Sequence, residues 1–197
     1  MELGSLAALI KNISRLPGLG PRSARRIVLH LIKNPDTTMV PLIEMLNQVR
    51  TEIKVCARCG NVDINSPCHI CTNSVRDKHT MCIVEDVGDL WAIERGDFYK
   101  GIYHVLGGTI SALDGRTPEK LNLHSLKDKV EKEQIKEVII ATNATLEGQT
   151  TAVYIVDMLK SCNVKSTRIA HGIPMGAELD YMDEGTLTLA LKMRQDF

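Results

Sequence analysis

Four of the six cysteines form two closely spaced pairs. The pairs are Cys56-Ala-Arg-Cys59 and Cys68-His-Ile-Cys71, and eight residues separate them. A two-residue spacer lets each pair turn tightly and direct both thiolates at one tetrahedral ion. Four thiolates leave no position for a catalytic water, so the pattern predicts one structural Zn²⁺ per chain.

A redox site is the alternative interpretation of a Cys-x-x-Cys sequence. It normally needs a single pair at the start of a helix, whereas two pairs occur together here. Gly60 follows the first pair and gives the backbone the freedom that a tight knuckle needs. Either His69 or His79 could replace a thiolate, but four spaced cysteines favour a Cys₄ site. Cys82 and Cys162 have apolar neighbours in the sequence, so we expect these two cysteines to be buried and to pack as small hydrophobic residues.

A second chemically suggestive segment is the turn Leu16-Pro-Gly-Leu-Gly-Pro21 between two amphipathic stretches. Its glycines can adopt positive φ and leave backbone N–H groups uncovered, which, with the start of the next helix, suits one phosphate. Residues 1–54 carry eight Lys/Arg against four Asp/Glu, which favours DNA over an ordinary solvated turn. The predicted DNA-binding residues are Gly18, Gly20, Arg22, Arg25 and Arg26.

A third group consists of acids that follow predicted strands. Glu85 and Asp89 come after one apolar run, and Glu147 comes after another. The carboxyl ends of parallel strands meet in one crevice, where clustered carboxylates could hold a Mg²⁺ ion weakly. The alternative, which the residues favour, is an acidic surface that docks a basic partner.

Length and composition fit an ordinary globular protein of 197 residues with 44% apolar and 24% charged residues. A net charge of zero excludes a general electrostatic attraction to nucleic acid, and 4% aromatic residues argue against a single-strand binder built on stacking. No apolar run reaches the roughly 20 residues that span a bilayer. The N-terminus has no signal-peptide pattern, so we expect a cytoplasmic protein.

The chain consists of three segments with different residue patterns. Residues 5–54 show helical periodicity, and residues 55–80 look like a small independent unit held together by metal. Beyond them, strands alternate with helices, which predicts an α/β fold with a mostly parallel sheet flanked by helices. The expected strands are 81–84, 102–106, 138–142 and 167–170, and the expected helices are 87–95, 126–133, 150–160 and 186–193.

The ordered set of motifs resembles the RecR family of bacterial recombination mediators over essentially the whole chain. The segments that carry the resemblance are 16–24, the four cysteines, 82–85, 105–108, 113–115, 141–148, 167–176 and 183–187. It implies a helix–hairpin–helix in 1–54, a Cys₄ zinc finger in 55–80, a Toprim domain in 81–165, and a Walker-B-like segment with a closing helix in 166–197.

The resemblance also implies a function without catalysis. RecR-like proteins act in recombinational repair of gapped DNA, with RecO and in many bacteria RecF, to load RecA onto DNA coated with single-strand binding protein. They bind duplex and gapped DNA regardless of sequence, form ring-shaped homo-oligomers, commonly tetramers, and work in the cytoplasm at the nucleoid.

Four positions are carried over from the family's motifs. Arg22 and Arg26 match positions implicated in DNA contact, and Glu85 and Glu147 match acidic Toprim positions that face RecO. Gln149 stands where many members keep an acid, which weakens Mg²⁺ binding. This departure argues against the main alternative, a Toprim-type metal-dependent nuclease or strand-transfer enzyme. The basic hairpin argues against a scaffold without DNA contact.

Overall fold

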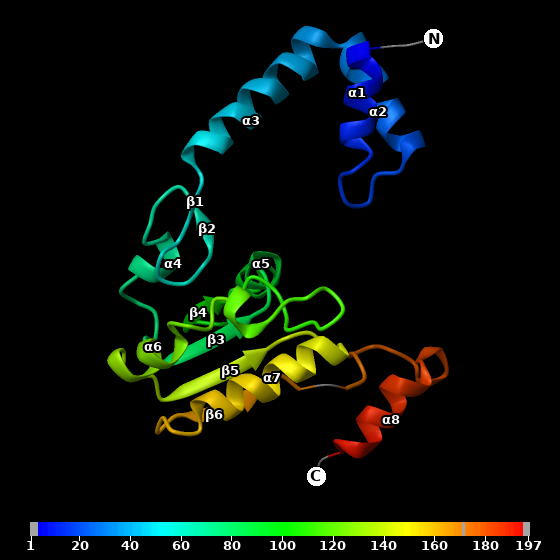
Figure 1. Ribbon diagram of the computed structural model, residues 1–197. Helices are drawn as coiled ribbons and strands as arrows, with labels where there is room; N and C mark the ends of the chain where they lie inside the picture. Colours follow the sequence, from blue (N-terminus) through cyan, green and yellow to red (C-terminus); the bar gives the residue numbers. More distant parts are fainter. Residues whose placement is uncertain (1–3, 171, 195–197) are drawn as a thin grey trace. The chain divides into compact units, whose positions relative to one another are not determined.

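A computed structural model describes residues 4–170 and 172–194, so parts of the predicted end segments 1–54 and 166–197 lie outside the described residues. The chain divides into two compact units, Met1–Ile53 and Lys54–Phe197 (Figure 1).

The first unit is helical, as the periodicity of its apolar residues predicts. Helix α2 begins at a proline, a residue suited to the first helical turn. Its buried residues Ala24, Val28 and Leu31 recur at intervals of four and three, which places them on one side. The elements are α1 (Gly4–Ile13), α2 (Pro21–Lys33), the π-helix η1 (Pro35–Met39) and α3 (Val40–Glu52).

The second unit starts with the cysteine-rich segment. Strands β1 (Lys54–Val55) and β2 (Val62–Asp63) form an antiparallel pair, and α4 (His69–Thr72) is a single helical turn. We call the segment from β1 to α4 the finger.

A four-stranded parallel sheet follows, in the order β4-β3-β5-β6 (Figure 1). The predicted parallel α/β architecture is confirmed. In its register, Ile83 lies between His104 on one neighbouring strand and Ile140 on the other. The strands are β3 (Thr80–Val84), β4 (Ile102–Val105), β5 (Glu137–Ala141) and β6 (Lys165–Arg168).

Helices and short 3₁₀ turns connect the strands. Helix α7 begins earlier than the periodicity indicates, because the Thr145 hydroxyl accepts a hydrogen bond from the Gly148 amide and caps the helix. The elements are α5 (Val87–Arg95), η2 (Pro118–Lys120), α6 (Leu126–Lys132), α7 (Leu146–Leu159), η3 (Leu179–Tyr181) and α8 (Glu184–Lys192).

Alternating strand residues divide the interior into two cores. Met81 and Ile83 face a core shared with α6 and α7. Cys82 and Val84 face a second core, which contains Leu90 of α5 and all four cysteines of the finger. The finger is therefore not the independent unit that its sequence suggests, because it forms part of the cover on one side of the sheet.

The two remaining cysteines differ. Cys82 is buried, as predicted, and burial raises its pKa to about 12. Cys162 is only partly buried: its sulfur lies 3.5 Å from a Glu131 carboxylate oxygen, at the margin of the first core. Among the described residues, no helix is long and apolar enough to cross a membrane.

Candidate functional site

The four cysteines of the finger converge on one point. Their sulfurs all lie within 4.8 Å of one another, and all four residues are buried. The separations are 3.9 Å between the Cys56 and Cys71 sulfurs and 3.5 Å between the Cys59 and Cys68 sulfurs. Zinc–sulfur bonds of about 2.3 Å give a tetrahedron with sulfur–sulfur edges of about 3.8 Å. The cluster therefore has the donor set and the dimensions of a structural metal site.

Backbone amides support the sulfurs in two tight turns. The Asn61 amide donates to the Cys59 sulfur at 3.4 Å, and the Cys68 amide donates to the Cys56 sulfur at 3.3 Å. Gly60 has a φ of 82°, so the conformational freedom expected after the first pair is used. These amides stabilise negative charge on the sulfurs, which metal ligation requires.

The cluster also favours ionisation of one of its members. Hydrogen bonding with the Cys71 thiol, together with the Asn61 amide, lowers the pKa of Cys59 to about 5. The same interaction with Cys59 raises the pKa of Cys71, because two neighbouring thiolates repel each other. A cation at the centre of the cluster would relieve this repulsion, because it attracts every sulfur.

Side chains of α6 and its C-terminus fasten the finger to the sheet. The Arg58 guanidinium forms a two-pronged ion pair with Glu133, with nitrogen–oxygen distances of 3.2 and 3.0 Å. Its third contact is the Cys71 carbonyl at 3.3 Å. Lys129 donates to the Arg58 carbonyl at 2.8 Å and to the Tyr103 carbonyl at 3.4 Å. Two of these contacts, Arg58 with Glu133 and Lys129 with Arg58, join residues more than 70 positions apart in the sequence.

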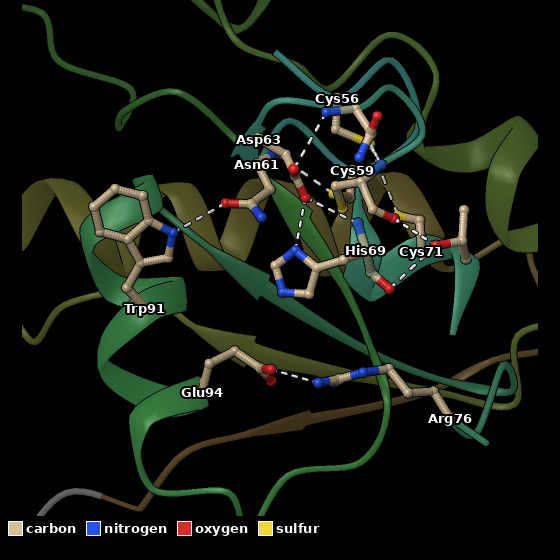
Figure 2. A network of polar contacts seen from close by, with 12 residues as sticks. Cys56, Cys59, Asn61, Asp63, His69, Cys71, Arg76, Trp91 and Glu94 are labelled. Atoms are coloured by element: carbon tan, nitrogen blue, oxygen red, sulfur yellow. Dashed lines mark hydrogen bonds and ion pairs between the residues drawn. The ribbon is translucent and has the colours of Figure 1, made fainter. Parts of the chain in front are cut away.

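A second connection runs from the finger to α5 and β4. Figure 2 shows the indole of Trp91 directed at the side chain of Asn61, where its nitrogen donates to the amide oxygen at 3.2 Å. Asn61 is thus bonded to Trp91 by its side chain and to the Cys59 sulfur by its backbone. The Val105 amide donates to the Cys59 carbonyl at 2.7 Å.

The two histidines considered as substitute ligands have other partners. The His69 ring lies 2.6 Å from an Asp63 carboxylate oxygen, and the His69 amide donates to the same oxygen at 2.9 Å (Figure 2). This amide is the main reason why the pKa of Asp63 lies below its usual range. His79 has a ring nitrogen 3.0 Å from the Gln134 carbonyl oxygen.

The hairpin between α1 and α2 has the exposed backbone that a phosphate site needs. Gly18 has a φ of 76°, whereas Gly20 is extended, with a φ of −86°, so only the first glycine uses the left-handed region. The Leu19 amide is bonded to the Leu16 carbonyl at 3.1 Å. Within the described part of the chain, the Gly18 and Gly20 amides have no intramolecular acceptor.

The three predicted DNA-contacting arginines are all exposed. Arg22 and Arg26 are four residues apart on the side of α2 away from its buried residues, and Arg25 lies beside them. Among residues 4–170 and 172–194, no carboxylate lies within ion-pair distance of any of the three. Their charges are therefore available to an external anion.

The acidic residues at the strand ends do not form a comparable cluster. In the described residues, the four cysteines are the only group of three or more possible metal ligands whose donor atoms lie so close together. Asp89 accepts from the Asp86 amide at 3.0 Å within the capping box of α5. Glu85 accepts from the backbone and side-chain nitrogens of Asn143, both at 2.7 Å. Glu147 lies half-buried in the first turn of α7.

Comparison with known proteins identifies the family. The helix–hairpin–helix model of RecR matches residues 6–50, the Toprim domain model matches 79–170, and the C-terminal model of RecR matches 172–195. Recombination protein RecR of Rhizobium leguminosarum bv. trifolii is 54% identical over 186 residues, which are 94% of this chain and 92% of the relative. The chain belongs to the RecR family.

Other RecR proteins give the same result. The recombination protein RecR of Methylobacterium radiotolerans is 53% identical over 189 residues, which cover 96% of this chain and 94% of the relative. That of Parvibaculum lavamentivorans is 51% identical over 189 residues, covering 96% and 95%. In this RecR-family chain, the four cysteines lie between the first two matched segments.

Proposed function

We propose that this RecR-family protein is a non-enzymatic mediator of recombinational DNA repair, which binds DNA backbones without reading their sequence. It acts with RecO, and with RecF where that protein exists, to load RecA onto gapped DNA coated with single-strand binding protein. The RecR names of its relatives as recombination proteins support this role.

The hairpin is the observation that carries the DNA-binding part of the proposal. Residues 4–34 contain six Lys/Arg and no Asp or Glu, although the whole chain is neutral. The uncovered Gly18 and Gly20 amides and the unpaired arginines of α2 point to a phosphate, since both kinds of donor recognise anions. The Arg22, Arg25 and Arg26 side chains add sequence-independent affinity.

Zinc is the metal that best fits the finger. Four thiolates select zinc or an iron–sulfur centre, and sulfur separations near 3.8 Å match a single tetrahedral zinc ion. Cys56, Cys59, Cys68 and Cys71 would hold the ion, which supplies structural cross-linking and no catalysis. Its role is to keep the finger folded against the second core.

The acidic strand ends are proposed as a docking surface for RecO rather than as a Mg²⁺ site. Glu147 and the adjacent Leu146, which is 77% exposed, lie at the start of α7. A half-buried carboxylate beside an exposed apolar side chain fits a partner that presents a basic and apolar surface. Asp89 lies in the first turn of α5, which follows the neighbouring strand β3.

Self-association into a ring is proposed from the first unit. Its helices enclose an open apolar groove of about 470 Å³, lined by ten residues that are all apolar. Helix α3, which the structure describes completely, has no buried residue, and Leu42, Ile43 and Leu46 are each more than 40% exposed. Apolar surface of this kind favours burial against a second copy of the chain.

A Toprim-type nuclease or strand-transfer enzyme is the alternative function. The spacing of the acids at the strand ends argues against it: a metal-dependent reaction needs converging ligands, and in the described residues only the four cysteines form such a group. Incubation of supercoiled plasmid with the protein and Mg²⁺ or Mn²⁺ tests the alternative directly, since a nicked product would support it.

The DNA-binding proposal is tested by measuring affinity for gapped DNA at several salt concentrations. The Arg22→Ala/Arg26→Ala variant should bind more weakly and lower the salt slope by about 0.9 for each phosphate that it no longer neutralises. The control is Arg50→Ala/Lys54→Ala, which removes two exposed cations outside α2. An equal decrease in affinity for both variants would show that only net charge matters.

The mediator role is tested by RecA filament formation on gapped DNA coated with single-strand binding protein, with cognate RecO present. The intact protein should accelerate loading, and the Arg22→Ala/Arg26→Ala and Glu147→Lys variants should not. If a zinc-loaded preparation that binds RecO gives no acceleration, the mediator proposal is wrong.

A further inference from the structure

Glu85 occupies a central position among the loops that follow three strands. Its carbonyl oxygen accepts from the Gly107 and Gly108 amides after β4, both at 2.9 Å. Its carboxylate accepts from the backbone and side-chain nitrogens of Asn143 after β5, both at 2.7 Å. Since Glu85 itself follows β3, one residue connects the carboxyl ends of β3, β4 and β5.

Gly148 makes this arrangement possible. A Cβ atom at this position would lie 2.3 Å from the Asn143 carbonyl oxygen and 2.7 Å from a Glu85 carboxylate oxygen. Real side chains do not approach other atoms so closely, so any larger residue must displace the loop that carries Asn143. Gly148 is also buried in the first turn of α7, although its φ is ordinary. The absence of a side chain, rather than an unusual backbone conformation, is what the position requires.

We infer that Glu85 is a positioning residue: through its two hydrogen bonds with Asn143 it fixes the loop before α7. We call Glu85, Asn143 and Gly148 the strand-end lock. Both Glu85 oxygens accept an N–H group of Asn143, so the carboxylate and the Asn143 loop hold each other in one orientation.

The lock determines how α7 begins. Asn143 is followed after one residue by Thr145, which caps the helix, and then by Leu146 and Glu147 in its first turn. A fixed Asn143 therefore gives Leu146 and Glu147 one geometry before any partner arrives. The inference rests on the proposed function only in assigning Leu146 and Glu147 to RecO; the lock itself is a property of the free protein.

The chain offers a matched control for Gly148. Gly88 lies in the first turn of α5, as Gly148 lies in the first turn of α7, and a Cβ atom there would meet nothing within 4 Å. Alanine is favoured over glycine in helices. Gly88→Ala should therefore leave the melting temperature unchanged or raise it slightly. Gly148→Ala should lower it by more than about 4 °C and make the Asn143 amide exchange hydrogen roughly tenfold faster.

Exchanging the carboxylate and the amide between positions 85 and 143 tests the side-chain hydrogen bond between Glu85 and Asn143. Asn143→Asp places two carboxylates in contact and should lower the melting temperature. Adding Glu85→Gln should restore it, because the introduced amide group can then donate to the introduced carboxylate while its own oxygen still accepts from the backbone. This second test remains decisive if Gly148→Ala fails to fold.

Two results would overturn the lock: equal melting temperatures for the two glycine variants, or no rescue by the double substitution. None of these measurements needs RecO or DNA. Failure of the RecO assay with intact melting results would instead refute only the proposed docking surface.

Discussion

The finger and the acidic strand ends lie in the same compact unit, and each brings acidic side chains close to the sheet. Their polar atoms nevertheless have different partners. The four sulfurs are buried, and within the described part of the chain they are bonded to one another and to backbone amides. The carboxylates of Glu85 and Asp89 are bonded to nitrogens of the protein. Ligand type is therefore insufficient for a metal site: the donor atoms must also converge on one point, as only the four sulfurs do among the described residues.

The largest expected effect comes from breaking the sulfur cluster. Cys59→Ser should reduce the zinc content from one ion per chain to near zero, because a neutral hydroxyl does not replace a thiolate at a Cys₄ site. Metal ligation supplies on the order of 10 kcal/mol in isolated zinc fingers. We expect the finger to unfold and to expose part of the second core, which metal analysis and thermal unfolding would detect.

Cys162→Ser is the matched control, because this cysteine lies outside the cluster and is partly exposed. It should retain one zinc ion and melt close to the wild type. Retention of zinc by Cys59→Ser would contradict the ligand assignment and would indicate that another residue, such as His69, supplies the fourth ligand.

The buried imidazole of His104 predicts an effect of pH on the free energy of unfolding. Burial on β4 lowers the pKa of His104 to about 4, below its usual value of 6.5. The unfolded chain therefore takes up this proton at a higher pH than the folded chain does. Stability should be fully present above about pH 6.5 and should fall by up to about 3 kcal/mol as the pH drops to about 4.

A variant separates His104 from other acid-sensitive groups, including the cysteines. His104→Gln keeps a donor for the Asn122 carbonyl but does not titrate. Denaturant unfolding of both proteins between pH 4 and 7, with zinc present, should show a shallower loss of stability in the variant. Parallel curves would assign the acid sensitivity to groups other than His104.

The smallest expected effect concerns the attachment of the finger to α6. Arg58→Ala removes a partly buried ion pair with Glu133, which should cost about 1 kcal/mol and accelerate zinc release to a chelator several-fold. Lys132→Ala removes the exposed pair with Asp128 on the same helix and should leave zinc release unchanged. Equal release rates in both variants would show that the shared core alone holds the finger.

The sequence predicts those features that depend on local pattern. The two Cys-x-x-Cys pairs bring their sulfurs together because each spacing is set within a few residues. The bounds of α5 agree with its apolar periodicity and its acidic cap. The parallel sheet follows from the alternation of strands and helices.

Features that depend on distant residues could not be predicted in the same way. The finger packs against Tyr103 and Val105, which lie more than 30 residues later in the sequence, so it looked independent. The bond between Glu85 and Asn143 spans 58 residues and depends on side-chain orientation. The signal that could have revealed it is Gly148, a glycine in a helical turn where alanine would be favoured.

The single tryptophan gives the protein an intrinsic optical probe of its finger. Trp91 donates to Asn61, and the Asn61 amide donates to the Cys59 sulfur (Figure 2). Movement of that turn changes the hydrogen bond of the indole and with it the polarity that the excited state senses. The emission spectrum of the unlabelled chain should therefore follow chelation and reconstitution in real time, on DNA and in the presence of partners that lack tryptophan.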